Sequence, residues 1–532
     1  MTTFAIAGRR VESRQSTLGI VLRDIGGLQM IVAASMVVSL FVSLLYVEVW
    51  SAISFGLGAA VTSTVGWLGY RTFADAGEPK RRHAMIVAGA GWLACAVSGS
   101  LPFLIAAWIT PEDAADAMVP EGAAFGSSLA YFRNPLHCLF ESMSAWTTTG
   151  LTMAVHEPTL GHGLLFYRSL AQWLGGAGMI VLSLAIIPRA SSVGGLDLYQ
   201  SETTGMKLRP TVIGTARSIW KIYSTLTLLV AGYLFLSLRV LLPDYPWRSA
   251  LFDAVNHAMT GLATGGFSTL DDSIASYGSW AVEMFHVPPM VLGAISLPLY
   301  FTLLRQRHPR VMWRDPQFRS MMLVLLFLVP ACAVLLVPSA AVANPLREGL
   351  FQVVSGVSGT GWQTSAIGDW TPAAVLVLAW GGMIVSGSAG STVGGVKLIR
   401  AFLLVSAIRW RIRSVFLPGR AVVPFRVGDR SLPLATMRQE VADAATITFL
   451  YLIVLAVATV VVALFAGPGF TLADVLFECV SAQSTVGLSA GLTRPDMPAV
   501  VEVVFIFQMW VGRLEIFPVL VLLGALLPAR RP

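Results

Sequence analysis

The chain has 532 residues, of which 55% are hydrophobic and only 12% are charged, and its mean hydropathy is +0.72. These values lie far from those of a soluble globular protein and place most of the chain in a lipid bilayer. The net charge is +7, and the basic inner face of the topology described below indicates a membrane and partner surface rather than a nucleic-acid site.

Ten membrane spans are predicted by a window of about 20 apolar residues. The first apolar run begins near Leu28 and is long enough to cross the bilayer, so we expect no cleavable signal. The predicted spans lie near residues 28–50, 52–70, 84–109, 164–188, 214–242, 280–304, 319–343, 372–407, 442–466 and 499–528.

Four short segments between these spans share one pattern: a helix-like stretch ends in residues rich in threonine and glycine, and an apolar span follows. They run from 140 to 150, 256 to 266, 351 to 361 and 477 to 487. In three of them the glycine follows a phenylalanine by ten residues, and a serine (Ser144, Ser355, Ser481) falls four after that phenylalanine. The second differs, because Phe252 to Gly266 is fourteen residues, about one extra helical turn. Its register, at Gly265 or Gly266, stays open.

Together the four segments have one physical interpretation. A cation that crosses a bilayer must exchange its water shell for oxygens of similar strength, and backbone carbonyls around a narrow axis supply them. Successive carbonyls face inward only on irregular or left-handed backbone, which glycine adopts without a Cβ clash. Such backbone at membrane depth must be buried in protein or line a wet cavity. The segments are therefore predicted to face one another as an ion-selectivity filter.

The predicted fold class is an all-α polytopic membrane protein with ten transmembrane helices, in which four helix–pore loop–helix repeats surround a central pore. A leading helix pair precedes the repeats. The predicted divisions are residues 1–75 for an N-terminal cytoplasmic segment and this pair, and 84–190, 213–305, 319–407 and 440–528 for the four pore repeats.

The charges orient this arrangement. With a cytoplasmic amino terminus, the predicted spans place 29 Lys and Arg residues inside, 6 outside and one, Arg513, within the membrane, as the positive-inside rule requires. The same spans place 18 of the 29 acidic residues outside, so the outer face carries −12 (6 minus 18). Basic residues that merely anchor the topology explain the inner excess but not the outer acids. An acidic outer face raises the cation concentration at the mouth.

Two further features indicate a gate. Residues 386–395 interrupt the eighth predicted span with four glycines and three serines, so a continuous helix is not expected there. Close helix packing through small residues is the alternative explanation. Arg513 lies in mid-span, where a charge costs at least ~2.5 kcal/mol and must face the interior or water. A structural salt bridge is its alternative role, although Glu515, two residues along, lies on a different helix face.

The sequence carries no enzyme signature. It lacks GxxxxGK[ST] and HExxH, has no GxSxG before a triad, and its seven histidines are scattered. The four cysteines lie far apart in apolar surroundings and are interpreted as packing residues. We therefore expect no enzyme, no transition-metal site and no organic cofactor in this chain.

These motifs resemble the Trk/Ktr/HKT superfamily of cation transporters, and most closely its TrkH type, over nearly the whole chain. The resemblance rests on the four filter-like segments, on the extra leading helix pair and on four further motifs. Those motifs are Trp173-Leu-Gly-Gly-Ala-Gly-Met-Ile180, Leu198-Tyr-Gln-Ser-Glu-Thr-Thr-Gly205, Gly387-Ser-Ala-Gly-Ser-Thr-Val-Gly-Gly-Val-Lys397 and Met509-Trp-Val-Gly-Arg-Leu-Glu-Ile516.

The resemblance implies potassium uptake across a bacterial inner membrane, with potassium held at twelve filter residues. These are Thr148, Thr149, Gly150, Thr264, Gly265, Gly266, Gly359, Thr360, Gly361, Thr485, Val486 and Gly487. A glycine in all four quarters implies preference for potassium over sodium. The implied gate is a mobile intramembrane loop beneath the filter together with a pore arginine. Its residues are Gly387, Gly390, Ser391, Gly394, Gly395, Lys397 and Arg513.

The resemblance also implies a homodimer surrounded by membrane lipid. A cytosolic nucleotide-binding partner of the regulator-of-K⁺-conductance type is expected on the basic inner loops, such as 305–319 and 409–438. Trp362, directly after the third filter glycine, departs from the pattern, and an aromatic ring there is expected to tighten the mouth.

Other classes of function make different predictions. A secondary transporter with a midplane site would show paired broken helices rather than four equivalent loops. A membrane enzyme would need clustered titratable residues facing a cavity, which the sequence does not suggest. Channel-like flow and proton- or sodium-linked symport are both compatible with the sequence.

Overall fold

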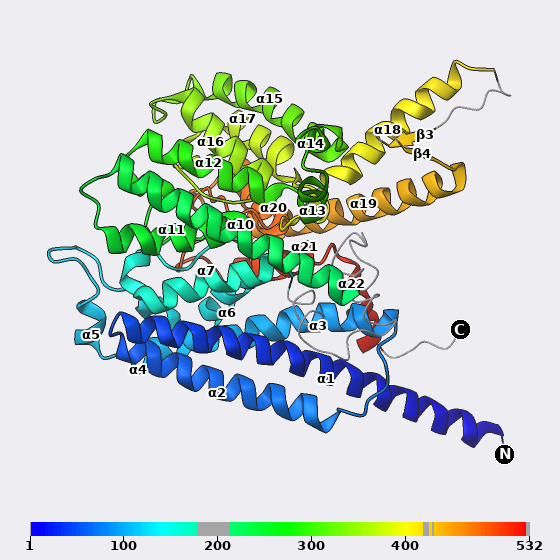
Figure 1. Cartoon of the computed structure of the whole chain (residues 1–532), viewed down its shortest axis with the longest axis horizontal. Helices are drawn as coiled ribbons and strands as arrows, with labels where there is room; N and C mark the ends of the chain where they lie inside the picture. Colours follow the sequence, from blue (N-terminus) through cyan, green and yellow to red (C-terminus); the bar gives the residue numbers. More distant parts are fainter. Residues whose placement is uncertain (1, 179–211, 419–424, 428–429, 528–532) are drawn as a thin grey trace. The chain divides into compact units, whose positions relative to one another are not determined.

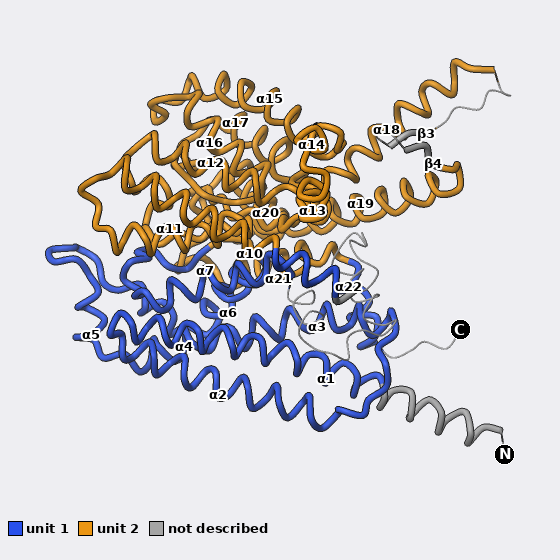
Figure 2. The backbone as a smooth tube through the Cα atoms, in the orientation of Figure 1, with its two compact units in different colours: residues 1–147, 152–221, 517–532 blue, residues 148–151, 222–516 orange. Residues whose placement is uncertain are grey.

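A computed structural model of the chain describes residues 2–178, 212–418, 425–427 and 430–527. It is mostly helical, with two short two-stranded sheets (Figure 1), so the predicted all-α class is confirmed. The motif at 198–205 and the end of the motif at 173–180 lie outside the described residues. The chain divides into two compact units, shown in Figure 2, and each is considered by itself.

The first unit comprises residues 1–147, 152–221 and 517–532. Its described elements are α1 (Thr2–Leu45), α2 (Val49–Thr72), α3 (Arg81–Gly99), α4 (Leu101–Ile109), α5 (Glu112–Asp116), η1 (Ser128–Arg133), α6 (Pro135–Trp146), η2 (Glu157–Leu160), α7 (His162–Gly176) and α22 (Phe517–Leu526). α1 and α2, the predicted leading pair, pack through small residues: a Cβ on Gly26 would lie 2.6 Å from the carbonyl oxygen of Gly66. Glycine thus permits the close approach typical of membrane helices.

The second unit comprises residues 148–151 and 222–516, and α10 (Val212–Leu241) crosses its boundary. Its other elements are α11 (Trp247–Leu262), η4 (Ser273–Tyr277), α12 (Trp280–Ala294), α13 (Leu297–Gln306), α14 (Arg310–Arg314), α15 (Pro316–Leu336), α16 (Pro345–Ser358), η5 (Ile367–Asp369), α17 (Pro372–Val377), the π-helix η6 (Leu378–Met383), β1 (Val385–Ser386), β2 (Val396–Lys397), α18 (Leu398–Val415), β3 (Phe425–Val427), β4 (Arg430–Leu432), α19 (Leu434–Phe465), α20 (Leu472–Ser484) and α21 (Ala499–Arg513).

Six described helices are long and apolar enough to cross a membrane, or eight if each of two bent pairs counts as one span. In one pair, α12 and α13 meet at 93°. The eighth predicted span, 372–407, is divided into α17, η6, two short strands and α18. This number of spans, counted over the described residues, is compatible with the ten predicted.

Four short helices precede the filter-like segments: α6, α11, α16 and α20, with 12, 16, 14 and 13 residues. They are called the pore helices below. Side chains cap three of them: Asn134 accepts from the N–H of Leu136, Asn344 from that of Arg347, and Thr471 from that of Asp474. Such caps fix where a helix begins. α11 is the longest of the four, in line with the extra turn that its sequence predicts.

Candidate ion pathway

The residues that follow the four pore helices share one backbone conformation. In each segment the first residue of the predicted filter triplet is left-handed, and so is the glycine two residues later. The φ angles are 57°, 51°, 70° and 52° at Thr148, Thr264, Gly359 and Thr485, and 93°, 78°, 88° and 93° at Gly150, Gly266, Gly361 and Gly487. In the second segment the glycine in this position is Gly266, which resolves the register left open above. Left-handed backbone is costly for residues with a Cβ, so its fourfold recurrence is a specific feature.

The four glycines close a ring. A Cβ on Gly150 would lie 2.2 Å from the carbonyl oxygen of Gly265, and one on Gly266 would lie 2.2 Å from that of Thr360. The same contact continues from Gly361 to Val486 at 2.0 Å, and from Gly487 back to Thr149 at 2.1 Å. Each glycine therefore faces the carbonyl of the middle residue in the next quarter. The sequence-predicted filter residues all lie in this ring, which belongs to the second unit.

Three of the pore helices, α11, α16 and α20, hold the ring by hydrogen bonds that recur between quarters. The N–H of Gly265 donates to the carbonyl of Thr260 at 2.8 Å, and the N–H groups of Thr360 and Val486 donate to the carbonyls of Ser355 and Ser481 at 2.9 Å. Two hydroxyls add a second bond. Ser355 Oγ accepts from the N–H of Gly361, and Ser481 Oγ from that of Gly487, both at 3.0 Å. The serine spacing was visible in the sequence, but only the structure gives these serines a role in fixing the filter-like backbone.

Trp362 lies behind the ring, not at its mouth. Its side chain is fully buried, and a Cβ on Gly261 would lie 2.5 Å from its indole ring. His257 and His286 pack edge-on against it, with ring centroids 5.6 and 5.3 Å away. The expectation that this ring tightens the mouth is therefore not met; Trp362 fills the space between the pore helix of the second quarter and α12.

The glycine- and serine-rich segment 386–397 is irregular, as predicted, and lies directly against the ring. β1 and β2 pair in parallel at its two ends, and Gly387, Gly390 and Gly395 have positive φ. Thr392 Oγ1 lies 2.9 Å from Thr264 Oγ1, and a Cβ on Gly394 would lie 2.2 Å from Thr485 Oγ1. The segment thus touches the first residue of the triplet in the second and fourth quarters.

Two basic side chains accompany this segment. Arg513 ends α21, and its Nη1 donates to Thr148 Oγ1 at 3.1 Å and to the carbonyl of Thr392. Lys397 is buried and donates to the carbonyl of Val393. Arg513 therefore joins the first filter segment to the loop. This places the predicted gating residues in one cluster next to the ring.

Glu515, the acid nearest to Arg513 in sequence, forms its ion pair with Arg400 of α18. Glu515 and Ile516 both have positive φ, 54° and 73°, which is unusual for residues with a Cβ and rare for a β-branched one. The break between α21 and α22 is therefore held in a strained conformation, with α18 bonded to it. Sequence spacing argued against Glu515 as the partner of Arg513 on one helix face, but it could not identify Arg400 as the partner of Glu515.

The many apolar helices and the ring define a polytopic membrane transport protein. A family model described as "Cation transport protein" matches residues 83–346 and 339–531, and the chain belongs to this family, TrkH. The resemblance stated from the motifs is confirmed, and the chain is a transporter rather than an enzyme.

Similar proteins cover nearly the whole chain. The Trk system potassium uptake protein TrkH of Halomonas elongata is 31% identical over 95% of this chain and 98% of its own length. An uncharacterized cation transporter of Methanocaldococcus jannaschii is 30% identical over 95% of each chain. The crystal structure of the potassium transporter TrkH from Vibrio parahaemolyticus matches with a TM-score of 0.74 and 28% identity, over 96% of this chain and 99% of that one.

Proposed function

We propose that this chain takes up potassium across the bacterial inner membrane through the glycine ring, which acts as its selectivity filter. Relatives such as the Halomonas elongata protein are potassium uptake proteins by name, and the ring supplies the chemistry that uptake needs. Left-handed glycine backbone brings one middle-residue carbonyl per quarter into contact with the next quarter. Oxygens arranged in this way replace the hydration shell of a cation.

The single observation that carries the proposal is the closure of this ring. Each of the four glycines meets a carbonyl of the following quarter, and the fourth quarter meets the first. Four unrelated loops would have no reason to share these contacts or the paired left-handed residues that produce them. The potassium sites of the proposal are the twelve residues of the four triplets.

The gate of the proposal is the segment 386–397 with Arg513. The segment between β1 and β2 contains no α-helix, so it can rearrange without the loss of a continuous helix. Arg513 contacts both the segment and Thr148, which puts a fixed positive charge next to the filter. A cation that passes close to this charge is repelled until the loop or the arginine moves.

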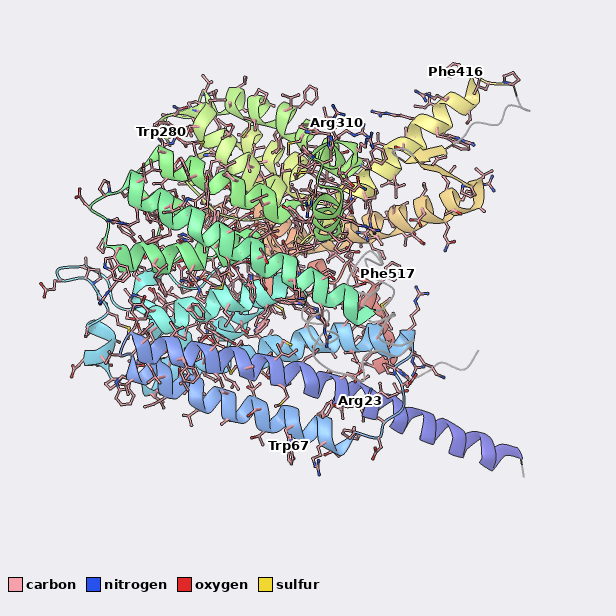
Figure 3. All side chains as sticks on the ribbon, in the orientation of Figure 1. Arg23, Trp67, Trp280, Arg310, Phe416 and Phe517 are labelled. Carbon is pink, nitrogen blue, oxygen red and sulfur yellow. The ribbon has the colours of Figure 1, made fainter. Side chains whose placement is uncertain are left out.

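The regulatory site of the proposal is the pair α18 and α19. Arg409, Arg411 and Arg413 are exposed on α18, whose far end carries Phe416 (Figure 3). A small core of Leu403, Phe425 and Met437 ties α18, β3 and α19 together. This basic surface suits a cytosolic nucleotide-binding partner, and the proposed assembly is a homodimer. The part of the loop between α18 and α19 at 419–424 lies outside the described residues.

Growth tests the proposed function directly. A bacterium without its own potassium uptake systems should grow in low potassium when it expresses this chain with a regulator subunit, and washed cells should take up rubidium as a potassium tracer. A strain that carries the empty vector is the control. Membrane-inserted protein that supports neither growth nor tracer uptake, or that transports sodium and potassium equally, would contradict the proposal.

A further inference from the structure

One side chain in every quarter binds the chain just beyond the ring. It occupies the second position of each predicted filter segment, one residue after the phenylalanine or, in the second quarter, after Asn256. The bonds are Glu141 Oε2 to the N–H of Met153 (2.8 Å), His257 Nε2 to Ser268 Oγ (3.1 Å), the Gln352 oxygen to the N–H of Thr364 (2.7 Å), and Glu478 Oε2 to the N–H of Ala490 (2.8 Å). The side chain at this position therefore links each pore helix to the segment that follows the ring residues.

The fourth quarter has the densest set of these bonds. Glu478 is fully buried. Its Oε1 accepts from Ser489 Oγ at 2.8 Å, from the N–H of Thr493 at 3.0 Å and from Thr493 Oγ1 at 2.5 Å. With Ala490, two of the four donors are backbone N–H groups, which can only donate. Donors around both oxygens stabilise the ionised carboxylate and oppose the effect of burial, which favours the neutral acid.

Glu141 and Glu478 differ in how their charge is balanced. Glu141 is also fully buried, but Arg168 Nε donates to it at 2.7 Å and neutralises it within the protein. Among the described residues, no basic side chain forms an ion pair with Glu478. An isolated buried charge is costly unless a counter-charge is near. In the proposed filter, a cation bound at the ring would supply the counter-charge that Glu478 lacks among the described ion pairs.

We infer that Glu478 is an affinity-determining residue, whose ionised carboxylate is balanced by the permeating cation and strengthens its binding at the ring. The inference rests on the proposed function, since it assumes that the ring binds potassium. Glu478 lies on the helix that leads into Thr485 and Gly487, and it binds residues two to six positions beyond Gly487. Its field reaches the ring through a water-poor interior, where Coulomb interactions are least screened. Glu478 acts on the ion at a distance and positions the segment that follows the ring residues.

Potassium-dependent tracer uptake by Glu478→Gln in the uptake-deficient strain tests this inference. Glutamine keeps the shape but not the charge, so we expect the half-saturating potassium concentration to rise about 3- to 10-fold, with little change in maximal rate per inserted molecule. Glu478→Asp keeps the charge and should stay within about twofold of the unaltered protein. Asp496→Asn is the matched control, because it removes a charge from an exposed side chain farther along the same chain segment.

Three results would overturn the inference. A half-saturating concentration that is unchanged in Glu478→Gln would mean that the carboxyl is neutral or too far from the ion. Equal loss of inserted protein in Glu478→Gln and Glu478→Asp, without a change in half-saturation, would mean that Glu478 only holds the segment that follows the ring residues. An equal rise in Asp496→Asn would mean that general surface charge sets the effect. Gly487→Ser is measured alongside to test the filter separately. If Gly487→Ser alters selectivity while Glu478→Gln keeps a normal half-saturating concentration, the role of Glu478 is rejected and the filter is not.

Discussion

At the scale of single residues, the ring glycines are the most sensitive positions. Serine at Gly150, Gly361 or Gly487 would place a Cβ within 2.0 to 2.2 Å of a carbonyl oxygen and in a left-handed conformation that costs roughly 1–2 kcal/mol. An effect of that size on relative ion binding corresponds to about 5- to 30-fold. We expect each substitution to lower the potassium-to-sodium uptake ratio, with sodium gaining.

Gly467→Ser is the matched control for these variants. Gly467 has a φ of +80° and is exposed, but a Cβ there meets nothing within 4 Å. It therefore carries the same conformational cost without the ring contact, and its uptake ratio should equal that of the unaltered protein. Unchanged ratios in all three ring variants would remove the basis for the filter assignment.

Arg513 offers a second prediction at this scale. A guanidinium 5 Å from a passing cation opposes it by about 3 kcal/mol at an effective dielectric of ~20. Arg513→Ala should therefore raise potassium flux per molecule while the preference over sodium is kept, and Arg513→Lys should resemble the unaltered protein. Uptake rate and detergent-extracted amount are measured together. A smaller amount of protein with no gain in flux would show that Arg513 stabilises the fold instead.

The sequence predicted which residues form the ring but not all of the contacts that support it. Triplets such as Thr148–Gly150 are recognisable because, in three of the four segments, the glycine follows a phenylalanine at the same distance. Trp362 could not be placed in this way, since its neighbours His257 and His286 lie 105 and 76 residues away in the chain. Arg400 and Glu515 are likewise 115 residues apart. Pairings of this kind depend on how helices pack, which local pattern does not encode.

At the scale of elements, α18 carries three exposed arginines, Arg409, Arg411 and Arg413. Reversal of Arg409, Arg411 and Arg413 to glutamate should weaken binding of a purified regulator subunit. Because fewer charges then attract the regulator, added salt should change the binding less than it does for the unaltered protein. Membrane insertion should be unaffected. Binding is measured in detergent at low and physiological ionic strength.

Arg133→Glu and Arg494→Glu together are the control for α18, since both side chains are about half exposed, at 48% and 51%, and the predicted topology places them outside. They should leave regulator binding unchanged. Binding that is indifferent both to the α18 reversals and to ionic strength would reject this interface. The break before α18, at residues 386–395, was predicted from glycine and serine content, whereas the bend between α12 and α13 was not.

At the scale of the whole molecule, composition and hydropathy were sufficient for the class of protein, and the repeated triplets for its family. The division into two compact units was not predicted, because it depends on long-range packing rather than on repeat boundaries. Of the five divisions proposed from the sequence, the first is the N-terminal segment with the leading helix pair and the other four are pore repeats. The repeats remain a prediction about the order of similar segments along the chain.

The ring is built from one polypeptide, and its quarters are not copies. Thr149, Gly265, Thr360 and Val486 occupy equivalent middle positions with different side chains. A substitution therefore alters one quarter of the ring and leaves the other three unchanged. In an assembly of identical chains, the same substitution would alter all four quarters at once. In the proposed filter, selection can therefore adjust ion preference in small steps, and each quarter can take on a different function.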